Sequence, residues 1–187
     1  MIKVFTGPMY SEKSLNLIRV YESIKDKSTV QAFKPSLIHK VNTVIHSRSI
    51  CNDINCKVIH DLGEIESNID NKTKVIIIDE FQFLTGNVKT IVKMSIERGI
   101  NFYIAGLSST FEQGPFGLMP YILAVANEIT MCNADCFDCK KHKAEYTIIS
   151  IDKEIRNKYK NGFIPLCIDC LRRRKNNEQV NNGSINQ

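Results

Sequence analysis

The chain has 187 residues, 43% of them hydrophobic, and carries a formal net charge of +5. This composition excludes a disordered chain and suits one α/β domain with a small appendage. No apolar run approaches the roughly 20 residues that span a bilayer, and no N-terminal segment resembles a signal peptide. We therefore expect a soluble cytoplasmic protein, whose modest positive charge suits a phosphorylated ligand.

The chain begins with a predicted strand, loop and helix in the pattern of a phosphate-binding loop. After the apolar residues Ile2, Val4 and Phe5, the loop consists of Gly7, Pro8, Met9, Tyr10, Ser11, Glu12, Lys13 and Ser14. In the motif G-x-x-x-x-G-K-[ST], backbone amides cradle phosphates, the lysine reaches the outer phosphates and the hydroxyl ligates Mg²⁺. The sequence therefore predicts a phosphate site here, with an ordinary strand-turn-helix as the alternative.

Glu12 is the departure from this motif, because it stands where the second glycine belongs. A carboxylate that faces the phosphates would repel them. The Cβ atom would also restrict a backbone that elsewhere uses the conformational freedom of glycine. We therefore expect ATP to bind more tightly to a Glu12→Gly variant than to the natural sequence.

Strands and helices alternate along the rest of the first two thirds of the chain. A stripe of Leu17, Val20, Tyr21 and Ile24 predicts that the first helix packs on a sheet. Further strands are predicted at residues 29–33, 44–45, 56–60, 74–80, 101–105 and 128–131, and further helices at residues 62–69, 88–96 and 121–126. This alternation predicts right-handed βαβ units and a parallel sheet with helices on both faces.

The predicted strand at residues 74–80 ends in two carboxylates, Asp79 and Glu80. Its run of β-branched side chains is typical of the middle of a parallel sheet. In P-loop proteins an acidic residue at such a strand end positions Mg²⁺, and a neighbouring carboxylate can accept a proton from an attacking hydroxyl. We predict these roles for Asp79 and Glu80, the alternative being that both only solvate a strand end or cap the next element.

Seven cysteines in a reducing compartment favour metal binding or free thiols over disulfides. The pairs Cys136-x-x-Cys139 and Cys167-x-x-Cys170 supply four thiolates, enough to close a tetrahedral structural zinc site. Two redox pairs or free thiols are the alternative. The remaining cysteines have no matching spacing and are interpreted as core or free thiols; they are Cys51, Cys56 and Cys132.

The composition changes near Cys132, where cysteine pairs replace helical patterns. We expect a P-loop ATP-binding α/β domain at residues 1–132, a zinc-binding lasso domain at residues 133–174 and a tail at residues 175–187. The tail is rich in Asn and Gln and has little to bury, so we expect it to be disordered.

The motifs occur in a characteristic order, which is Gly7-Pro8-Met9-Tyr10-Ser11 with Lys13-Ser14, Phe33-Lys34-Pro35, Ser47-Arg48, Ile78-Asp79-Glu80-Phe81-Gln82-Phe83, Ala105-Gly106-Leu107, Phe111, Pro115-Phe116-Gly117 and the two cysteine pairs. This ordered set, which extends over residues 1–172, resembles the thymidine kinases of the type shared by bacteria, poxviruses and the animal cytosol.

The resemblance implies an enzyme that moves the γ-phosphate of ATP to the 5′-hydroxyl of thymidine, with Mg²⁺ accompanying ATP. It also implies a structural Zn²⁺, a lasso that closes over thymidine, and a homotetramer. Glu80 would be the catalytic base. ATP and Mg²⁺ would be bound by Gly7, Pro8, Met9, Tyr10, Ser11, Glu12, Lys13, Ser14, Asp79 and Gln82. Thymidine would contact Met9, Phe83, Leu107, Phe111 and Phe163, with the backbone near residues 148–151 at its base edge, and zinc would bind Cys136, Cys139, Cys167 and Cys170.

Departures from the family pattern support a second hypothesis, a catalytically weak or inactive homologue that acts as a nucleotide-binding or interaction module. Besides Glu12, the family's Asp-x-Arg-Tyr is replaced at residues 38–41, an aspartate is replaced by Ser108 and a basic residue by Glu112-Gln113. The lasso's arginine is also missing near Ile148. These changes remove charges that position phosphates, whereas the retained lysine, serine and carboxylates favour an active enzyme.

A third hypothesis is a zinc-ribbon protein that binds nucleic acid through the basic residues at positions 172–175. Proteins that bind nucleic acid in this way usually combine a basic stripe with interleaved aromatic side chains. The basic run here is short and lacks such aromatic residues, so nucleic acid is not the partner that we expect.

Overall fold

The computed structural model describes residues 1–36, 43–47, 52–159 and 162–183, with side chains up to residue 177. Its strands are β1 (Ile2–Gly7), β2 (Val30–Pro35), β3 (Val44–Ile45), β4 (Ile54–Asn55), β5 (Lys57–Ile59), β6 (Val75–Ile78), β7 (Asn101–Leu107), β8 (Glu128–Met131), β9 (Ala134–Asp135), β10 (Lys143–Ala144), β11 (Tyr146–Ile149) and β12 (Phe163–Leu166). Its helices are α1 (Lys13–Ser23), α2 (Glu64–Ser67), α3 (Lys89–Glu97), α4 (Met119–Val125), α5 (Lys153–Lys158) and α6 (Ile168–Gly183), with the 3-10 helices η1 (Lys27–Thr29) and η2 (Phe81–Phe83).

The chain forms two compact units, each of which is described by itself. The first, called here the sheet unit, comprises Met1–Thr6, Glu12–Ser108 and Pro115–Cys132. The second, called here the knuckle unit, comprises Gly7–Ser11, Ser109–Gly114 and Asn133–Gln187. The peptide bond between Ser11 and Glu12 therefore joins the two halves of the predicted phosphate loop, one half in each unit.

A six-stranded parallel sheet with the order β5-β2-β6-β7-β1-β8 forms the centre of the sheet unit. In its middle strand β6, Ile76 lies between Gln31 of β2 and Phe102 of β7, and every residue of β6 is buried. A strand without an exposed face must be apolar throughout, as the predicted strand at residues 74–80 is. The prediction of a parallel sheet is confirmed.

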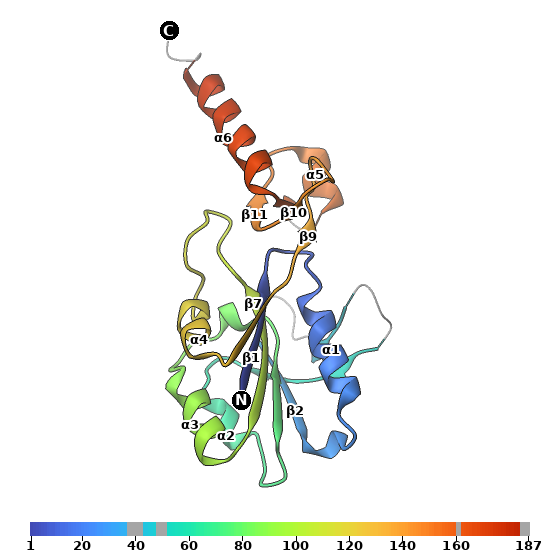
Figure 1. Cartoon of the computed structure of the whole chain (residues 1–187), viewed down its shortest axis with the longest axis vertical. Coiled ribbons are helices and arrows are strands. Elements are labelled where there is room, and N and C mark those ends of the chain that lie inside the picture. The colour runs from blue at the N-terminus through green and yellow to red at the C-terminus, as the bar shows by residue number, and fades with distance from the viewer. Residues whose placement is uncertain (37–42, 48–51, 160–161, 184–187) are drawn as a thin grey trace. The chain divides into compact units, whose positions relative to one another are not determined.

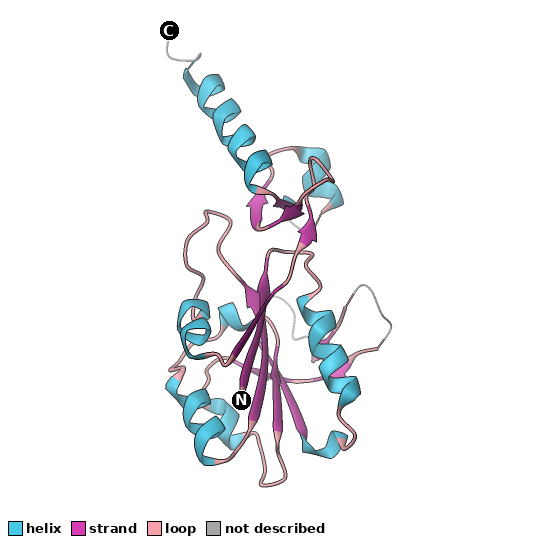
Figure 2. Ribbon diagram, in the orientation of Figure 1, coloured by secondary structure: helices cyan, strands magenta, loops and turns pink. Residues whose placement is uncertain are grey.

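Helices cover both faces of this sheet, which Figure 1 shows with α1 on one side and α2, α3 and α4 on the other. On the α1 face, Leu17 and Ile18 pack with Phe5 and Ile77. On the opposite face, apolar side chains of three helices join Ile76 and Phe102 in the other core cluster; they are Ile65, Ile91, Met94, Met119 and Ile122. Figure 2 shows the strands of this unit enclosed between its helices. The predicted α/β class is confirmed.

Some predicted elements are shorter in the structure than the sequence pattern indicates. The predicted helix at residues 62–69 is a single turn, α2, and the predicted strand at residues 56–60 is the three-residue β5. The strand predicted at residues 29–33 instead extends further in the structure, because β2 ends at Pro35, which pairs with Ile59. A proline is tolerated at a strand end, because fewer ladder hydrogen bonds depend on its missing N–H.

The knuckle unit contains two short antiparallel pairs, β9 with β10 and β11 with β12. Its core cluster of buried residues is small and consists of Cys136, Ile164, Leu166, Cys167, Cys170 and Leu171. Helix α5 begins after Asp152, whose side chain accepts hydrogen bonds from the amides of Glu154 and Ile155. This N-cap explains why a polar six-residue segment becomes helical.

The expectation of a disordered tail at residues 175–187 differs from the structure, because α6 continues through Ile168–Gly183. Cys170 and Leu171 are buried in the first turns and anchor the helix. Once a helix is nucleated, each further residue adds a backbone hydrogen bond at little cost, even without an apolar face. The last residues, 184–187, lie outside the described part. Among the described helices, none is long and apolar enough to cross a membrane.

Candidate functional site

In the sheet unit, three polar residues lie close together, two at the start of a helix and one at the end of a strand. Lys13 and Ser14 begin α1, and Asp79 directly follows β6. The Ser14 hydroxyl donates to the Asp79 carboxylate, with Oγ 3.0 Å from Oδ2 and 3.2 Å from Oδ1. The amide of Glu80 also donates to Asp79 Oδ1 at 3.0 Å. A hydroxyl and a carboxylate so placed are the hard oxygen ligands that Mg²⁺ takes in proteins.

Charge and burial shift the pKa values of this cluster. Burial and the neighbouring charge of Glu80 raise the pKa of Asp79 to about 7, although the Ser14 hydrogen bond and the charge of Lys34 oppose the shift. Burial lowers the pKa of the Lys13 ammonium, and the negative charges of Glu80 and Asp79 oppose this. A cation bound at Asp79 would replace its proton, so the cluster is suited to receive positive charge.

Glu80 is held in a defined position by its neighbour Gln82. Gln82 Nε2 donates to Glu80 Oε2 at 2.6 Å, and Gln82 Oε1 accepts from the amide of Leu107 at 3.0 Å. The Glu80 backbone has φ of 53°, in the left-handed region that L residues rarely adopt. The conformation turns the chain sharply after Asp79 and leaves the Glu80 side chain half-buried at the end of the sheet.

Gly117 shows how closely the chain packs around Gln82. Its φ is +51°, and a Cβ atom added there would lie 2.1 Å from the Gln82 carbonyl oxygen. Such a distance is far below van der Waals contact, so only glycine fits. The Pro115-Phe116-Gly117 motif therefore supports the segment that carries Glu80, a role that its sequence pattern alone did not reveal.

Glu12 also has a left-handed backbone, with φ of 58°. Glycine adopts this conformation without strain, whereas an L residue pays a steric cost. The strain inferred from the sequence is thus present at this residue, and the Glu12 side chain is exposed.

The residues predicted to contact a nucleoside fall into both units. In the sheet unit, the ring of Phe83 packs edge to face on Phe116 at 5.2 Å between centroids and remains 43% exposed; Leu107 is half-buried. In the knuckle unit, the rings of Phe111 and Phe163 lie 6.4 Å apart, and Met9 is half-buried. Each unit therefore has partly exposed apolar side chains among the residues predicted to contact a nucleoside.

Two contacts involve residues to which the sequence analysis gave no role. The Lys34 charge acts on Asp79, and Lys34 Nζ donates to the Val44 carbonyl oxygen at 3.2 Å. In the knuckle unit, Thr147 Oγ1 accepts from the amide of Met9 at 2.8 Å. Lys34 lies near the carboxyl end of β2, and Asp79 directly follows the neighbouring strand β6, which is a usable signal. No sequence pattern points to Thr147. The replaced segment at residues 38–41 and Cys51 lie outside the described residues.

The four predicted metal ligands lie together in the knuckle unit. The sulfur atoms of Cys136, Cys139, Cys167 and Cys170 are all within 4.8 Å of one another. Cys139 Sγ and Cys167 Sγ are 3.9 Å apart, close to the ~3.8 Å edge of a tetrahedron with Zn–S bonds of ~2.3 Å. The donor set therefore fits a closed structural zinc site.

Hydrogen bonds to the sulfur atoms support this interpretation. Backbone amides of Lys141 and His142 lower the pKa of Cys139 to about 6, and the Cys167 amide donates to Cys136 Sγ at 3.4 Å. The Arg173 guanidinium donates to Cys170 Sγ at 3.2 Å, although burial and the neighbouring cysteine sulfurs raise the pKa of Cys170 to about 12 without a bound metal. Donors aimed at sulfur stabilise thiolates, and thiolates are the form that binds zinc.

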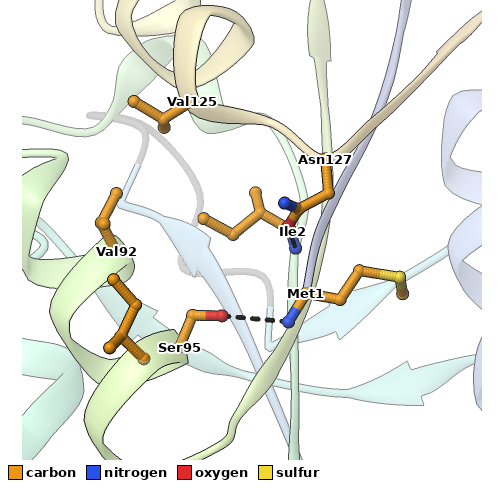
Figure 3. Close-up of a pocket in the computed structure, with 7 residues that line it drawn as sticks. Met1, Ile2, Val92, Ser95, Val125 and Asn127 are labelled. Atoms are coloured by element: carbon orange, nitrogen blue, oxygen red, sulfur yellow. Dashed lines mark hydrogen bonds between the residues drawn. The ribbon is translucent and has the colours of Figure 1, made fainter.

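A pocket of about 390 Å³ lies elsewhere in the sheet unit, around the amino end of β1. Figure 3 shows the Met1 amino group beside Ser95, whose Oγ atom it contacts at 3.0 Å. The pocket is lined by Met1, Ile2, Val92, Ser95, Ile96, Val125 and Asn127. Lys13, Ser14 and Asp79 follow the carboxyl ends of their strands, so this apolar pocket is separate from the polar cluster.

Comparison with known proteins gives consistent results. The family model described as "Thymidine kinase" matches residues 1–171. The chain is 35% identical over 159 residues to "Thymidine kinase" of Mycoplasma mobile, covering 82% of this chain and 78% of the relative. It is 27% identical over 174 residues to "Thymidine kinase" of Pseudothermotoga lettingae, covering 90% and 93%. It is 33% identical over 139 residues to "Thymidine kinase" of Bdellovibrio bacteriovorus, covering 74% and 68%.

Proposed function

Because the chain belongs to the thymidine kinase family, we propose that it transfers the γ-phosphate of ATP to the 5′-hydroxyl of thymidine. One observation carries this proposal. The half-buried Lys13 and Ser14 form a polar cluster with the buried Asp79, and Glu80 follows Asp79 directly. Phosphoryl transfer depends mainly on positioning and on charge stabilisation, and these four residues supply both.

The proposed roles follow from the chemistry of each side chain. Lys13 neutralises the outer phosphates of ATP, with the loop residues Gly7, Pro8, Met9, Tyr10, Ser11 and Glu12 around them. Ser14 and Asp79 hold Mg²⁺, which supplies charge stabilisation to the transferred phosphoryl group when it is bound. Glu80 accepts the proton of the 5′-hydroxyl. Gln82, predicted among the ATP and Mg²⁺ ligands, is better placed to fix the direction of the Glu80 carboxylate, because its amide contacts that group.

The candidate nucleoside contacts are the apolar side chains that the family pattern indicates, each considered within its own unit. These are Phe83 and Leu107 in the sheet unit, with Met9, Phe111 and Phe163 in the knuckle unit. In the proposed enzyme Lys13, Ser14 and Asp79 of the sheet unit bind the phosphates and Mg²⁺, and the knuckle unit carries a structural zinc at Cys136, Cys139, Cys167 and Cys170. We further propose a cytoplasmic homotetramer.

A coupled assay that detects ADP, run with ATP, Mg²⁺ and each nucleoside in turn, tests the proposal. We expect turnover with thymidine above that with every other nucleoside. ATP binding without turnover on any nucleoside would contradict it and would indicate a nucleotide-binding homologue without activity.

A further inference from the structure

The segment Gly7–Ser11 is the first half of the phosphate loop in the proposed function, and it belongs to the knuckle unit. The amide of Met9 donates to Thr147 Oγ1 at 2.8 Å, a contact between residues 138 positions apart. Thr147 is buried on β11 and pairs with Pro165 of β12. Backbone amides of such a loop cradle phosphates, so a side chain that fixes one amide also orients its neighbours.

A chain of aromatic rings makes a second connection within the same unit. The ring of Tyr10 lies edge to face with Tyr159, with centroids 5.9 Å apart and planes at 89°. The ring of Tyr159 lies edge to face with Phe137 at 5.1 Å and 87°. Edge-to-face pairs have a preferred geometry and so restrict the orientation of both partners. The orientation of Tyr10 therefore depends on that of Phe137.

Phe137 lies inside the first cysteine pair, between Cys136 and Cys139. Its amide donates to the Pro165 carbonyl oxygen at 2.8 Å, and Pro165 is the residue that pairs with Thr147. One connection to the loop thus starts at Thr147 on β11, and the other starts at Phe137 within the first cysteine pair. A metal that fixes Cys136 and Cys139 also fixes the backbone that carries Phe137.

We propose that the knuckle unit positions the first half of the phosphate loop, with Thr147 and Tyr159 as positioning residues, so that zinc and nucleotide strengthen each other's binding. This inference rests on the proposed function, because it assumes that the loop binds ATP. If zinc raises ATP affinity by some factor, ATP must raise zinc affinity by the same factor. Neither residue needs to touch the phosphates for this coupling to operate.

The first test compares Thr147→Val with Thr147→Ser in the zinc-loaded full chain. Valine keeps the shape of threonine and removes the acceptor for the Met9 amide, whereas serine keeps the acceptor. A hydrogen bond contributes ~1 kcal/mol, so we expect ATP affinity to fall about fivefold in the valine variant and to remain in the serine variant. Hydrogen exchange at the Met9 amide should accelerate by a similar factor in the valine variant alone.

The second test compares Tyr159→Leu with Tyr121→Leu, in which a tyrosine that is 64% exposed on α4 changes in the same way. Zinc release to a chromogenic chelator is followed with and without ATP and Mg²⁺. We expect ATP to slow zinc release from the natural protein and from Tyr121→Leu. In Tyr159→Leu the slowing should be smaller, because one of the two connections is lost.

The outcomes separate this inference from the proposed function. If the natural protein fails to bind ATP, the proposed function is wrong, and faster exchange at Met9 in Thr147→Val would still support the positioning of the loop. If ATP binds but zinc release is the same with and without it, the coupling is overturned. Unchanged exchange at Met9 in Thr147→Val would show that Thr147 does not position the loop.

Discussion

The sheet unit and the knuckle unit are stabilised by different kinds of interaction. The sheet unit surrounds its strands with two clusters of buried apolar residues, including the fully buried Phe33, Ile76 and Phe102. The buried core of the knuckle unit has six residues, and three of them are cysteines. A core of that size stabilises little by itself. The comparison teaches that residues on the sheet are placed by ordinary packing, whereas the loops of the knuckle unit surround a small core and a four-cysteine cluster that could bind a metal ion.

The change with the largest expected effect is Cys167→Ser, which removes one zinc ligand. Structural zinc contributes on the order of 10 kcal/mol to the folding of small domains, so we expect loss of about one bound zinc per chain and rapid proteolysis within residues 133–172. The sheet unit should remain folded. Metal analysis and limited proteolysis test this expectation.

Cys56→Ser is the matched control for Cys167→Ser, because Cys56 is also buried but belongs to the core of the sheet unit. The control should keep its zinc and the protease resistance of residues 133–172. A Cys167→Ser protein with unchanged proteolysis would show that the knuckle unit is stable without metal, and the contrast between the two units would be lost.

The second-largest expected effect is the loss of turnover in Glu80→Gln, in the sheet unit. Loss of a general base typically lowers turnover by ~10²–10⁴, and the neutral amide cannot accept the proton of the 5′-hydroxyl. ATP affinity, measured by calorimetry, should change little, because Lys13 and the loop remain. Turnover equal to that of the natural protein would mean that another group takes the proton.

A smaller effect is expected from Asp79→Asn, and it depends on pH. The pKa of Asp79 is raised to about 7, from the usual value of 3.8 for an aspartate. Between these values the folded protein holds a proton that the unfolded chain has released, so this group's contribution to stability is present below pH 4 and is lost as the pH rises through about 7.

Urea unfolding at pH 5 and pH 8 measures this contribution. We expect the stability of the natural protein to fall more between these values than that of Asp79→Asn, by roughly 2–3 kcal/mol. Equal changes in the two proteins would show that Asp79 ionises normally. Mutations of the knuckle unit should leave this difference unchanged, which further separates the two units.

The smallest expected effect belongs to Glu12→Gly, at the junction of the two units. Glycine relieves the left-handed backbone at φ of 58°, but it also increases the freedom of the unfolded chain, so we expect a net stabilisation of about 0.5–1 kcal/mol. Removal of the carboxylate should also tighten ATP binding. Thermal unfolding and ATP titration of both proteins provide the measurements, and equal ATP affinities would mean that the Glu12 side chain does not affect the phosphates.

Much of the sheet unit could be predicted from sequence, because its strands and helices have strong and different periodicities. The run Val75–Ile78 indicates a buried strand without knowledge of its neighbours, and the spacing of the four cysteines indicates a zinc site. Contacts between distant residues could not be predicted in this way. The hydrogen bond from Gln82 to Glu80 and that from Met9 to Thr147 depend on how turns and strands are placed in space. Helix α6 has no apolar pattern that would predict it, and only the buried residues of its first turns anchor it.

Strand β1 lies between β7 and β8 in the sheet, although it precedes both of them in the chain and is synthesised before them. Its two neighbours begin only at Asn101 and Glu128. At translation rates of about 5–20 residues per second, β1 waits roughly 5–25 seconds for them. During that time its apolar side chains have no sheet to cover them, and exposed apolar strands of this kind are prone to aggregation. A nascent chain that stops before Asn101 leaves β1 without either partner, so β1 is made before its neighbours but incorporated only with them.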